Sequence, residues 1–203
     1  MKGGEEKTNE TCAMALKWIT HFIGDIHQPL HASGKAQGGN TINVTFGGLD
    51  TELHAVWDGY IIYLAAGGVH RFSNTTLAPY MSNLLSRIAD NDFLEPVEGW
   101  VRCVDPEKKV EECVVGWARE SNKWSCEFVY GELPEQGTDL VESGYAGRAV
   151  PIVEMQVVKA AVRLGVWLNA LVEREFAEDE DGEEEEGGYG GQAVLESGGL
   201  WEL

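Results

Sequence analysis

Two short segments of this chain carry the same pattern, a histidine followed four residues later by an aspartate. The pairs are His21 with Asp25 and His54 with Asp58. On an α-helix, side chains four positions apart lie on one face, so each pair presents an imidazole and a carboxylate to a common point. Each pair also lies among apolar residues with helical spacing. The pattern therefore predicts two packed helices that carry polar chemistry on one face.

Imidazole and carboxylate groups form a ligand set that suits zinc, and a catalytic zinc keeps three protein ligands and one open position. His31 follows the first pair closely and would join His54 and Asp58 in such a set. His21 and Asp25 would supply part of a second set. Two metals close together can clamp a phosphate and generate hydroxide for attack on phosphorus.

The pattern also has a simpler interpretation. A single pair of this kind on a helix is commonly an exposed polar or ionic pair of small energetic effect. Two pairs, each in an apolar helix and separated by the glycine-rich segment 33–40, favour a metal site. His27 falls off the face that His21 and Asp25 share, and we expect it on the surface without a metal role.

Apolar periodicity predicts a mostly helical chain. The expected helices cover residues 8–27, 51–65, 78–92 and 151–175, and part of 97–130 with a break at Asp105–Pro106. Pro29 should end the first helix because it disfavours helical geometry at Gln28. Pro151 suits the first turn of the last helix. Residues 41–46 alternate and are β-branched, so we expect a short strand there, followed by a turn at 47–50.

Charge divides the chain into a body, residues 1–176, and a tail, residues 177–203. The net charge is −19, and residues 178–186 contain eight acids in nine positions, followed by a glycine-rich segment. We expect this tail to be disordered. The acidic balance argues against nucleic-acid binding through a basic surface, but it does not exclude a metal site, because a bound cation can dominate the local charge.

Cysteines and sequons bear on the compartment. The four cysteines contain no C-x-x-C pair, which argues against a structural zinc knuckle and leaves disulfides and free thiols open: Cys12, Cys103, Cys113 and Cys126. Three N-x-S/T sequons, at Asn9, Asn43 and Asn74, favour a secreted glycoprotein. The first ten residues, MKGGEEKTNE, have no apolar signal segment, and no apolar run approaches a membrane span.

Three blocks of sequence, HFIGDIHQPLH, GGNTINVTFGG and LHAVWDGYII, resemble the core of the zinc-dependent single-strand nucleases of fungi and plants, the S1/P1 type. Two later blocks, WARESNKWSC and VEMQVVKAAVRLGVWLNAL, extend the resemblance over about residues 10–175. It implies an all-α helical bundle similar to zinc phospholipase C, with a short β-hairpin-like insertion around 41–53. It also implies an endonuclease that hydrolyses single-stranded DNA and RNA and removes 3′-phosphate from nucleotides, with three zinc ions in a complete family domain.

By motif position, the resemblance implies a complete zinc site at His31, His54 and Asp58. It implies that His21 and Asp25 form part of a paired zinc site. It also implies that Gly39 and Asn40 lie in a nucleobase-binding region. Asp25 is the implied catalytic residue, because its carboxylate would bridge the paired zincs that hold the attacking hydroxide. The same resemblance implies a secreted monomer that acts on nucleic acids and nucleotides and has no membrane association.

The chain also departs from the family pattern. The family completes its paired site with ligands that precede the first motif, including the amino group of an N-terminal tryptophan. The first twenty residues here contain no histidine, and Trp18 is internal. We therefore expect the C-terminal part of a family domain, with one zinc and little or no catalysis.

The missing upstream ligands and cysteine also bear on how the cysteines pair and on which other functions stay open. The family partner of the cysteine matching Cys126 is absent, so Cys126 would be unpaired or bonded to Cys12. Cys103 and Cys113 could pair with each other, although a separation of ten residues does not decide this. Two other functions stay open, a catalytically dead zinc-binding fragment and a phosphate-ester hydrolase of the phospholipase C type. The Gly-Gly-Asn segment and the nuclease-like spacing favour nucleotides.

Overall fold

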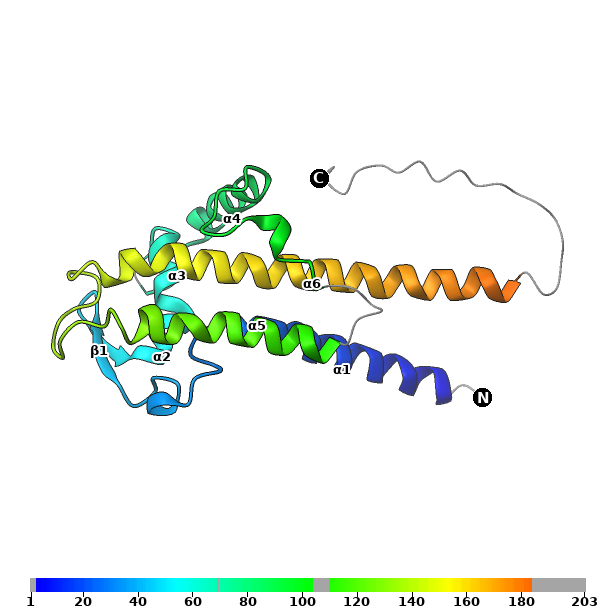
Figure 1. The fold of residues 1–203 in the computed structure, drawn as a ribbon, viewed down its shortest axis with the longest axis horizontal. Helices are drawn as coiled ribbons and strands as arrows, with labels where there is room; N and C mark the ends of the chain where they lie inside the picture. The colour runs from blue at the N-terminus through cyan, green and yellow to red at the C-terminus, as the bar shows by residue number, and fades with distance from the viewer. Residues whose placement is uncertain (1–2, 69, 104–109, 184–203) are drawn as a thin grey trace.

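The computed structural model describes residues 3–68, 70–103 and 110–183. A long helix, α6 (Tyr145–Glu183), forms the axis of the molecule, and α1 (Gly3–Ile26) and α5 (Val110–Trp124) run beside it (Figure 1). The remaining helices and a two-stranded sheet gather around the first half of α6. The predicted all-α architecture with a short β-hairpin is confirmed.

Helix α1 carries the first histidine–aspartate pair and ends at Ile26, three residues before Pro29, as the sequence predicts. Its chain then turns tightly, with the His27 N–H donating to the Gly24 carbonyl over 3.1 Å and the Gln28 N–H donating to the Asp25 carbonyl over 3.1 Å. This turn carries the chain away from the helix axis. His31 therefore folds back beside the last turn of α1.

The β-hairpin follows the glycine-rich segment. Strand β1 (Asn43–Phe46) pairs antiparallel with β2 (Leu49–Glu52). The turn consists of Gly47 and Gly48, whose φ values of 57° and 80° are both positive, a geometry that glycine adopts readily in two-residue hairpins. The helix expected over 51–65 therefore begins later, because residues 51 and 52 pair with β1.

The second histidine–aspartate pair lies in the short helices after the hairpin. The chain passes through α2 (Leu53–Ala55), the π-helical segment η2 (Val56–Tyr60) and α3 (Ile61–Ala65) without leaving a helical path. Asp58 lies in the π-helical segment. π-Helical turns are rare and are often found at functional sites.

Helix α4 (Asn74–Ala89) begins four residues before the predicted start because Ser73 caps it, accepting a hydrogen bond from the Thr75 N–H over 3.2 Å. Short 3-10 segments lie at η1 (Lys35–Gln37) and η3 (Val97–Gly99), and a π-helical segment, η4 (Ser125–Val129), continues α5. The predicted break at Asp105–Pro106 lies outside the described residues. Cys103 and Cys113 form a disulfide, whereas Cys12 and Cys126 are exposed free thiols.

Helix α6 differs from its prediction at both ends. It begins at Tyr145, so Pro151 lies inside the helix rather than in its first turn, and the missing proline N–H leaves the Gly147 carbonyl without its usual helical donor. Tyr145 is fully buried, which explains the earlier start. The helix also continues to Glu183, into the predicted tail. The rest of that tail, residues 184–203, lies outside the described residues.

The main hydrophobic core lies between the hairpin, α2–α3 and the first half of α6. Its larger members are Leu30, Phe46, Leu53, Trp57, Ile61, Leu140 and Tyr145. Trp57 donates from Nε1 to the Tyr145 hydroxyl over 3.0 Å, and this hydroxyl donates to the Val129 carbonyl over 2.9 Å. The histidine–aspartate residues thus stand on a closely packed platform. Among the described residues, no helix combines the length and hydropathy needed to cross a bilayer.

Candidate metal centre

His31, His54 and Asp58 come together at the end of α1 and the start of α2. One donor atom of each lies within 4.8 Å of the donors of the other two. The Asp58 carboxylate faces both rings, with Oδ1 lying 3.1 Å from His31 Nε2 and Oδ2 lying 3.3 Å from His54 Nε2. The two imidazoles stack with centroids 5.0 Å apart. We call these three residues the metal cluster.

A backbone carbonyl fixes the orientation of His54. Its Nδ1 lies 2.7 Å from the Gly38 carbonyl oxygen. Because a carbonyl only accepts, Nδ1 carries the proton of the neutral ring and Nε2 presents its lone pair to the cluster. Gly38 has a φ of +65°, and a Cβ there would meet the Leu30 carbonyl oxygen at 2.9 Å and His54 Nδ1 at 3.4 Å. Glycine is therefore required for this contact.

His31 lies in the loop after α1, and the main core anchors its backbone. The His31 N–H donates to the Gln28 carbonyl over 3.1 Å. Between these two residues, the Pro29 carbonyl accepts a hydrogen bond from the Ser125 hydroxyl, and Leu30 is buried. The three residues before the histidine are thus held in place, which limits the positions its ring can take.

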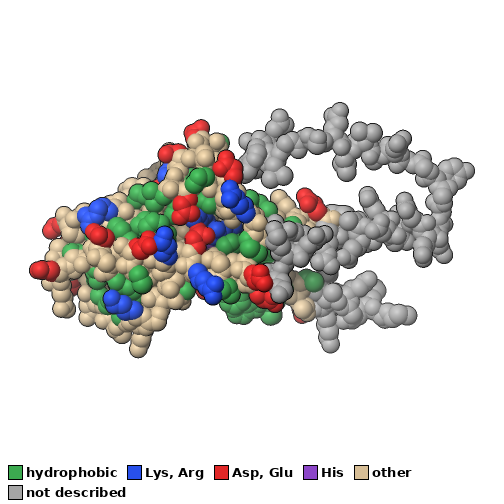
Figure 2. All heavy atoms as spheres, viewed as in Figure 1, with side chains coloured by type: hydrophobic (Ala, Val, Ile, Leu, Met, Phe, Trp, Pro, Cys, Tyr) green, Lys and Arg blue, Asp and Glu red, His purple; other side chains and the backbone are tan. Residues whose placement is uncertain are grey.

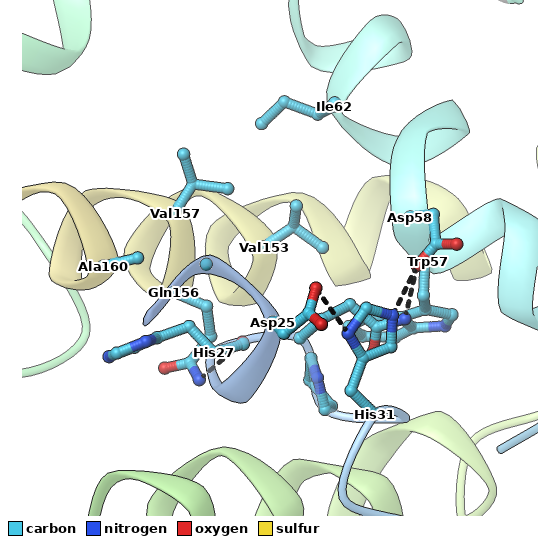
Figure 3. A pocket seen from close by; sticks show the side chains of 13 residues that line it. Asp25, His27, His31, Trp57, Asp58, Ile62, Val153, Gln156, Val157 and Ala160 are labelled. Atoms are coloured by element: carbon cyan, nitrogen blue, oxygen red, sulfur yellow. Dashed lines mark hydrogen bonds and ion pairs between the residues drawn. The ribbon is translucent and has the colours of Figure 1, made fainter. Parts of the chain in front are cut away.

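Asp25 lies between two histidines. Its Oδ2 is 3.2 Å from His21 Nε2, and its Oδ1 is 3.4 Å from His31 Nδ1. Figure 3 shows the chain of contacts from Asp25 through His31 to Asp58. The side chains of His21 and Asp25 are 59% and 39% exposed, so this pair is open to solvent. In the part of the chain that the structure describes, the ion pairs of Asp25 and Asp58 are all with histidines.

Mutual contacts shift the titration of the metal cluster. The hydrogen bond to Asp58 raises the pKa of His31, against the smaller opposing effect of burial. Burial acts to raise the pKa of Asp58, but hydrogen bonds from His31 and Gln28, with the nearby His54, hold that pKa below its usual value. Both shifts favour a positive charge next to the carboxylate. A metal cation would supply that charge in place of the His31 proton.

The donor chemistry of the metal cluster fits zinc. Two imidazole nitrogens and one carboxylate oxygen form the three-ligand set of catalytic zinc sites, and His54 has the second-sphere carbonyl partner common in such sites. A pocket of about 370 Å³ adjoins the cluster and is lined by Asp25, His31 and Asp58. Val153 and Val157 of α6 form an apolar part of its wall, so there is room for a ligand beside the donors (Figure 3).

The structure places the other predicted site residues as follows. Asp25 joins His21 to the edge of the metal cluster, but in the described residues only the metal cluster meets the geometry of a three-donor group. Gly39 is buried, and a Cβ there would touch Leu30. The Asn40 side chain is exposed and donates to the Gln37 carbonyl over 2.8 Å. Asn40 therefore stands at the surface of the loop that supports His54.

The expectation that His27 lies on the surface is wrong. Its ring is 2% exposed, with Nδ1 lying 2.6 Å from the Ile23 carbonyl oxygen and Nε2 lying 2.7 Å from Arg163 Nη1. Burial, together with the charge of Arg163, lowers its pKa to about 4. Helices α5 and α6 cover the side of α1 that faces away from His21. The apolar periodicity did not predict the burial of His27, because its ring lies just beyond the end of the helix.

Gln28 is a site residue that sequence reasoning missed. Its Nε2 donates to Asp58 Oδ1 over 2.7 Å. An amide is an uncommon zinc ligand, so its residue type gave no signal. Its position between Asp25 and His31, in the segment that carries three histidines, was the one feature that pointed to it.

Known proteins with similar sequences are nucleases. The chain is 35% identical to Nuclease S1 of Aspergillus oryzae over 159 residues, which is 77% of this chain and 54% of that protein. It is 32% identical to Nuclease P1 of Penicillium citrinum over 172 residues, covering 84% of this chain and 62% of the relative. It is 35% identical to Endonuclease 4 of Arabidopsis thaliana over 158 residues, covering 77% and 50%.

The chain spans about half the length of the curated relatives it matches. The model of one family, described as S1/P1 Nuclease, matches residues 2–173 and so covers both histidine–aspartate pairs and the packed helices that hold them. The sequence motifs, the helical fold with its hairpin and this match agree, and the chain belongs to the S1/P1 nuclease family.

Proposed function

We propose that this chain carries the zinc-binding part of a nuclease that hydrolyses phosphodiester bonds in single-stranded DNA and RNA and removes 3′-phosphate from nucleotides. The observation that carries the proposal is the metal cluster, in which His31, His54 and Asp58 converge on one point with no Lys or Arg ion pair among the described residues. The names of the relatives support the reaction class, because each is a nuclease or an endonuclease.

Zinc, when bound, supplies Lewis-acid polarisation of a phosphate group and activation of water. The protein groups prepare that chemistry. His54 and His31 bind as neutral rings, and Asp58 neutralises part of the cation charge. Asp25 is the proposed catalytic residue, because its carboxylate stands 3.4 Å from His31 and faces the pocket where a phosphate would lie. There the Asp25 carboxylate would accept a proton from the attacking water.

The proposed stoichiometry for this chain by itself is one zinc. His21 and Asp25 provide two further donors at the edge of the pocket, but in the described residues they do not belong to a second three-donor group. A paired-metal reaction needs two closely spaced cations. We therefore expect the 203-residue chain alone to cleave nucleic acid slowly at most.

Substrate recognition is assigned to the loop and pocket around the metal cluster. Gly39 and Asn40 lie in the loop beside His54, and we propose that Asn40, whose side chain is exposed, contacts the nucleobase. The acidic protein has no continuous basic surface on the face in Figure 2, where Lys and Arg side chains are scattered among acidic ones. Bound zinc would then be the main attraction for phosphate.

We propose an extracellular setting for the protein. The Cys103–Cys113 disulfide is typical of proteins folded in oxidising compartments. Asn43, at the start of β1, is exposed and belongs to an N-x-T sequon, so a glycan could be attached there. Treatment with a glycosidase after secretion from a eukaryotic host should lower the apparent mass, and an unchanged mass would contradict glycosylation.

The first test is zinc content per chain after dialysis. One zinc per chain, reduced to none in His54→Ala, supports the metal cluster as the binding site. No zinc would show that the cluster is only a polar network, and two or three would show that further residues of this chain complete a second site, which contradicts the proposed stoichiometry.

The second test separates the candidate reactions. The zinc-loaded chain should bind a nucleoside 3′-phosphate in a calorimetric titration, and a chelator should abolish this binding. Slow, chelator-sensitive cleavage of single-stranded DNA would support the nuclease. Hydrolysis of phosphatidylcholine with no binding of nucleotide would favour the phospholipase alternative, and zinc binding without any ligand or reaction would favour the catalytically dead form.

A further inference from the structure

Gln28 lies between α1 and His31, and both ends of its side-chain amide are engaged. Its Nε2 donates to Asp58 Oδ1 over 2.7 Å, and its Oε1 accepts from the Leu30 N–H. We propose that Gln28 is a positioning residue that holds the Asp58 carboxylate in its metal-binding orientation, an inference that rests on the proposed metal cluster.

The Asp58 carboxylate needs such a partner because its two oxygens serve different neighbours. Oδ2 faces His54 Nε2 at 3.3 Å, while Oδ1 lies 3.1 Å from His31 Nε2. The last torsion of an aspartate is broad, and the Asp58 side chain is 45% exposed, so the packing around it does not fix this rotation. The hydrogen bond from Gln28 fixes the position of Asp58 Oδ1. Because the two oxygens belong to one planar carboxylate, it also fixes the position of Oδ2.

Gln28 is itself rigid. The turn that contains it is closed by the His31 N–H donating to the Gln28 carbonyl, and Leu30 is 1% exposed in the main core. The Ser125 hydroxyl of η4 binds the Pro29 carbonyl. The orientation of Asp58 is thus fixed by a segment that also fixes His31, so two of the three donors share one support.

The neutral amide suits this role. Its NH₂ group donates a hydrogen bond to Asp58 without adding a positive charge at the place where a metal ion would bind. Its oxygen already accepts a hydrogen bond from the Leu30 N–H. A lysine or arginine in the same place would bind Asp58 as an ion pair and would repel an incoming metal. Outer-sphere partners of metal ligands typically change metal affinity by roughly 10–100-fold when they are removed.

Two substitutions separate the contact to Asp58 from the contact to Leu30. Gln28→Met keeps nearly the same length and removes both hydrogen bonds. Gln28→Glu keeps an oxygen for the Leu30 N–H but has no N–H for Asp58. Gln136→Met, in an exposed loop beside the hairpin, is the matched control.

Three quantities are measured for each variant: the zinc dissociation constant by chelator competition, the visible absorption of the Co²⁺-loaded chain, and the melting temperature of the metal-free chain. We expect Gln28→Met to bind zinc at least about tenfold more weakly and to shift the Co²⁺ bands. Gln28→Glu should restore the metal-free melting temperature but should restore neither the zinc affinity nor the bands. The control should match the wild type in all three.

The outcomes distinguish this inference from the proposed metal site. If the wild type binds no zinc or cobalt, both are overturned. If the wild type binds zinc and Gln28→Met binds it equally tightly, the metal site stands and the role of Gln28 is overturned. Recovery in Gln28→Glu of both the zinc affinity and the wild-type Co²⁺ bands would show that Gln28 acts only through the Leu30 turn, which also overturns the proposal.

Discussion

Two clusters of charged and polar groups lie on opposite sides of the end of α1, and they differ in what balances their charge. The metal cluster holds two imidazoles and a carboxylate, and these three side chains are between 21% and 45% exposed to solvent. The second, which we call the ionic cluster, consists of His27, Glu95, Glu120, Lys159 and Arg163. It contains its own cations, and the side chains of Lys159 and Arg163 are 0% and 3% exposed.

The comparison shows how a charged cluster can be either structural or open to a ligand. In the ionic cluster, Arg163 binds His27, the Trp100 carbonyl at 2.9 Å and Glu120 at 2.7 Å, and Lys159 binds Glu120 and Glu95. Each nitrogen of the two cationic groups therefore has at least one partner within the protein. The metal cluster offers lone pairs and negative charge, and within the described ranges no Lys or Arg pairs with its carboxylate. Its natural complement is therefore a cation from solution.

The largest expected effect comes from opening the ionic cluster. Glu120→Ala leaves Lys159 and Arg163 with one carboxylate fewer in a buried site, and removing one partner of a buried pair costs about 3–5 kcal/mol. We expect a loss of about 3 kcal/mol in urea unfolding of the metal-free chain, since Glu120 is partly exposed. Glu127→Ala, which removes a surface pair with Lys123, is the control and should cost under about 1 kcal/mol. Equal losses would mean that the ionic cluster is no more structural than a surface pair.

Acid should also lower the free energy of unfolding, through His27 on the side of α1 that faces the ionic cluster. The pKa of His27 falls from 6.5 unfolded to about 4 folded, so its contribution is complete above pH 6.5 and is lost as pH falls toward 4. At 1.36 kcal/mol per pKa unit, the loss reaches about 3 kcal/mol. His31, whose pKa is raised, acts in the opposite direction, adding stability below about pH 6.5.

The variant His27→Gln isolates the His27 contribution. Urea unfolding in the presence of a chelator, at pH 7 and pH 5, should show a smaller loss of stability in this variant than in the wild type. His70→Gln, at an exposed histidine, is the control and should keep the wild-type slope. If His27→Gln keeps that slope too, the ring is not held neutral by burial.

On the other side of the comparison, His54→Ala should remove zinc without unfolding the chain. It deletes one of three ligands, and we expect zinc affinity to fall by at least about 100-fold, since loss of an outer-sphere partner alone costs roughly 10–100-fold. Zinc titration with a colorimetric chelator measures this. His70→Ala should bind zinc normally, and an unchanged affinity in His54→Ala would mean that His54 is not a ligand.

A smaller effect is expected at the support of His54. Gly38→Ala places a Cβ 2.9 Å from the Leu30 carbonyl oxygen at a φ of +65°, so we expect a stability loss of about 1–2 kcal/mol and weaker zinc binding. Gly34→Ala, where a Cβ meets nothing within 4 Å, is the matched control. Full stability and affinity in Gly38→Ala would show that the loop adjusts and that the carbonyl contact to His54 is not required.

The sequence predicted those parts of the fold and candidate site that depend on local periodicity. Spacing placed His54 and Asp58 on one helical face, and alternation predicted the first strand with a turn beginning at Gly47. These features follow from neighbours in the chain, so a short window of sequence contains their cause. The second strand of the hairpin was expected only from the family resemblance, and His31 joined the proposed set through its ligand chemistry and its place in the family motif.

Features decided by distant contacts were not predicted. The burial of His27 depends on Arg163, 136 residues further along, and the role of Gln28 depends on Asp58, 30 residues away. The start of α6 is set by the burial of Tyr145 in the main core, which outweighs the preference of Pro151 for a first turn. Pairing of Cys103 with Cys113 needed the three-dimensional positions of both thiols.

The π-helical segment η2 gives this region an unusual sensitivity to length. A π-turn is wider than an α-turn and contains one residue more than regular winding requires. Because the wide turn absorbs this surplus residue, the helix before it and the helix after it can both keep a buried face toward the core. A further residue inserted within 56–60 would exceed what one wide turn absorbs and would rotate the later face by about 100° relative to the earlier one. An in-frame insertion of one codon here should therefore be more harmful than most substitutions in the same segment.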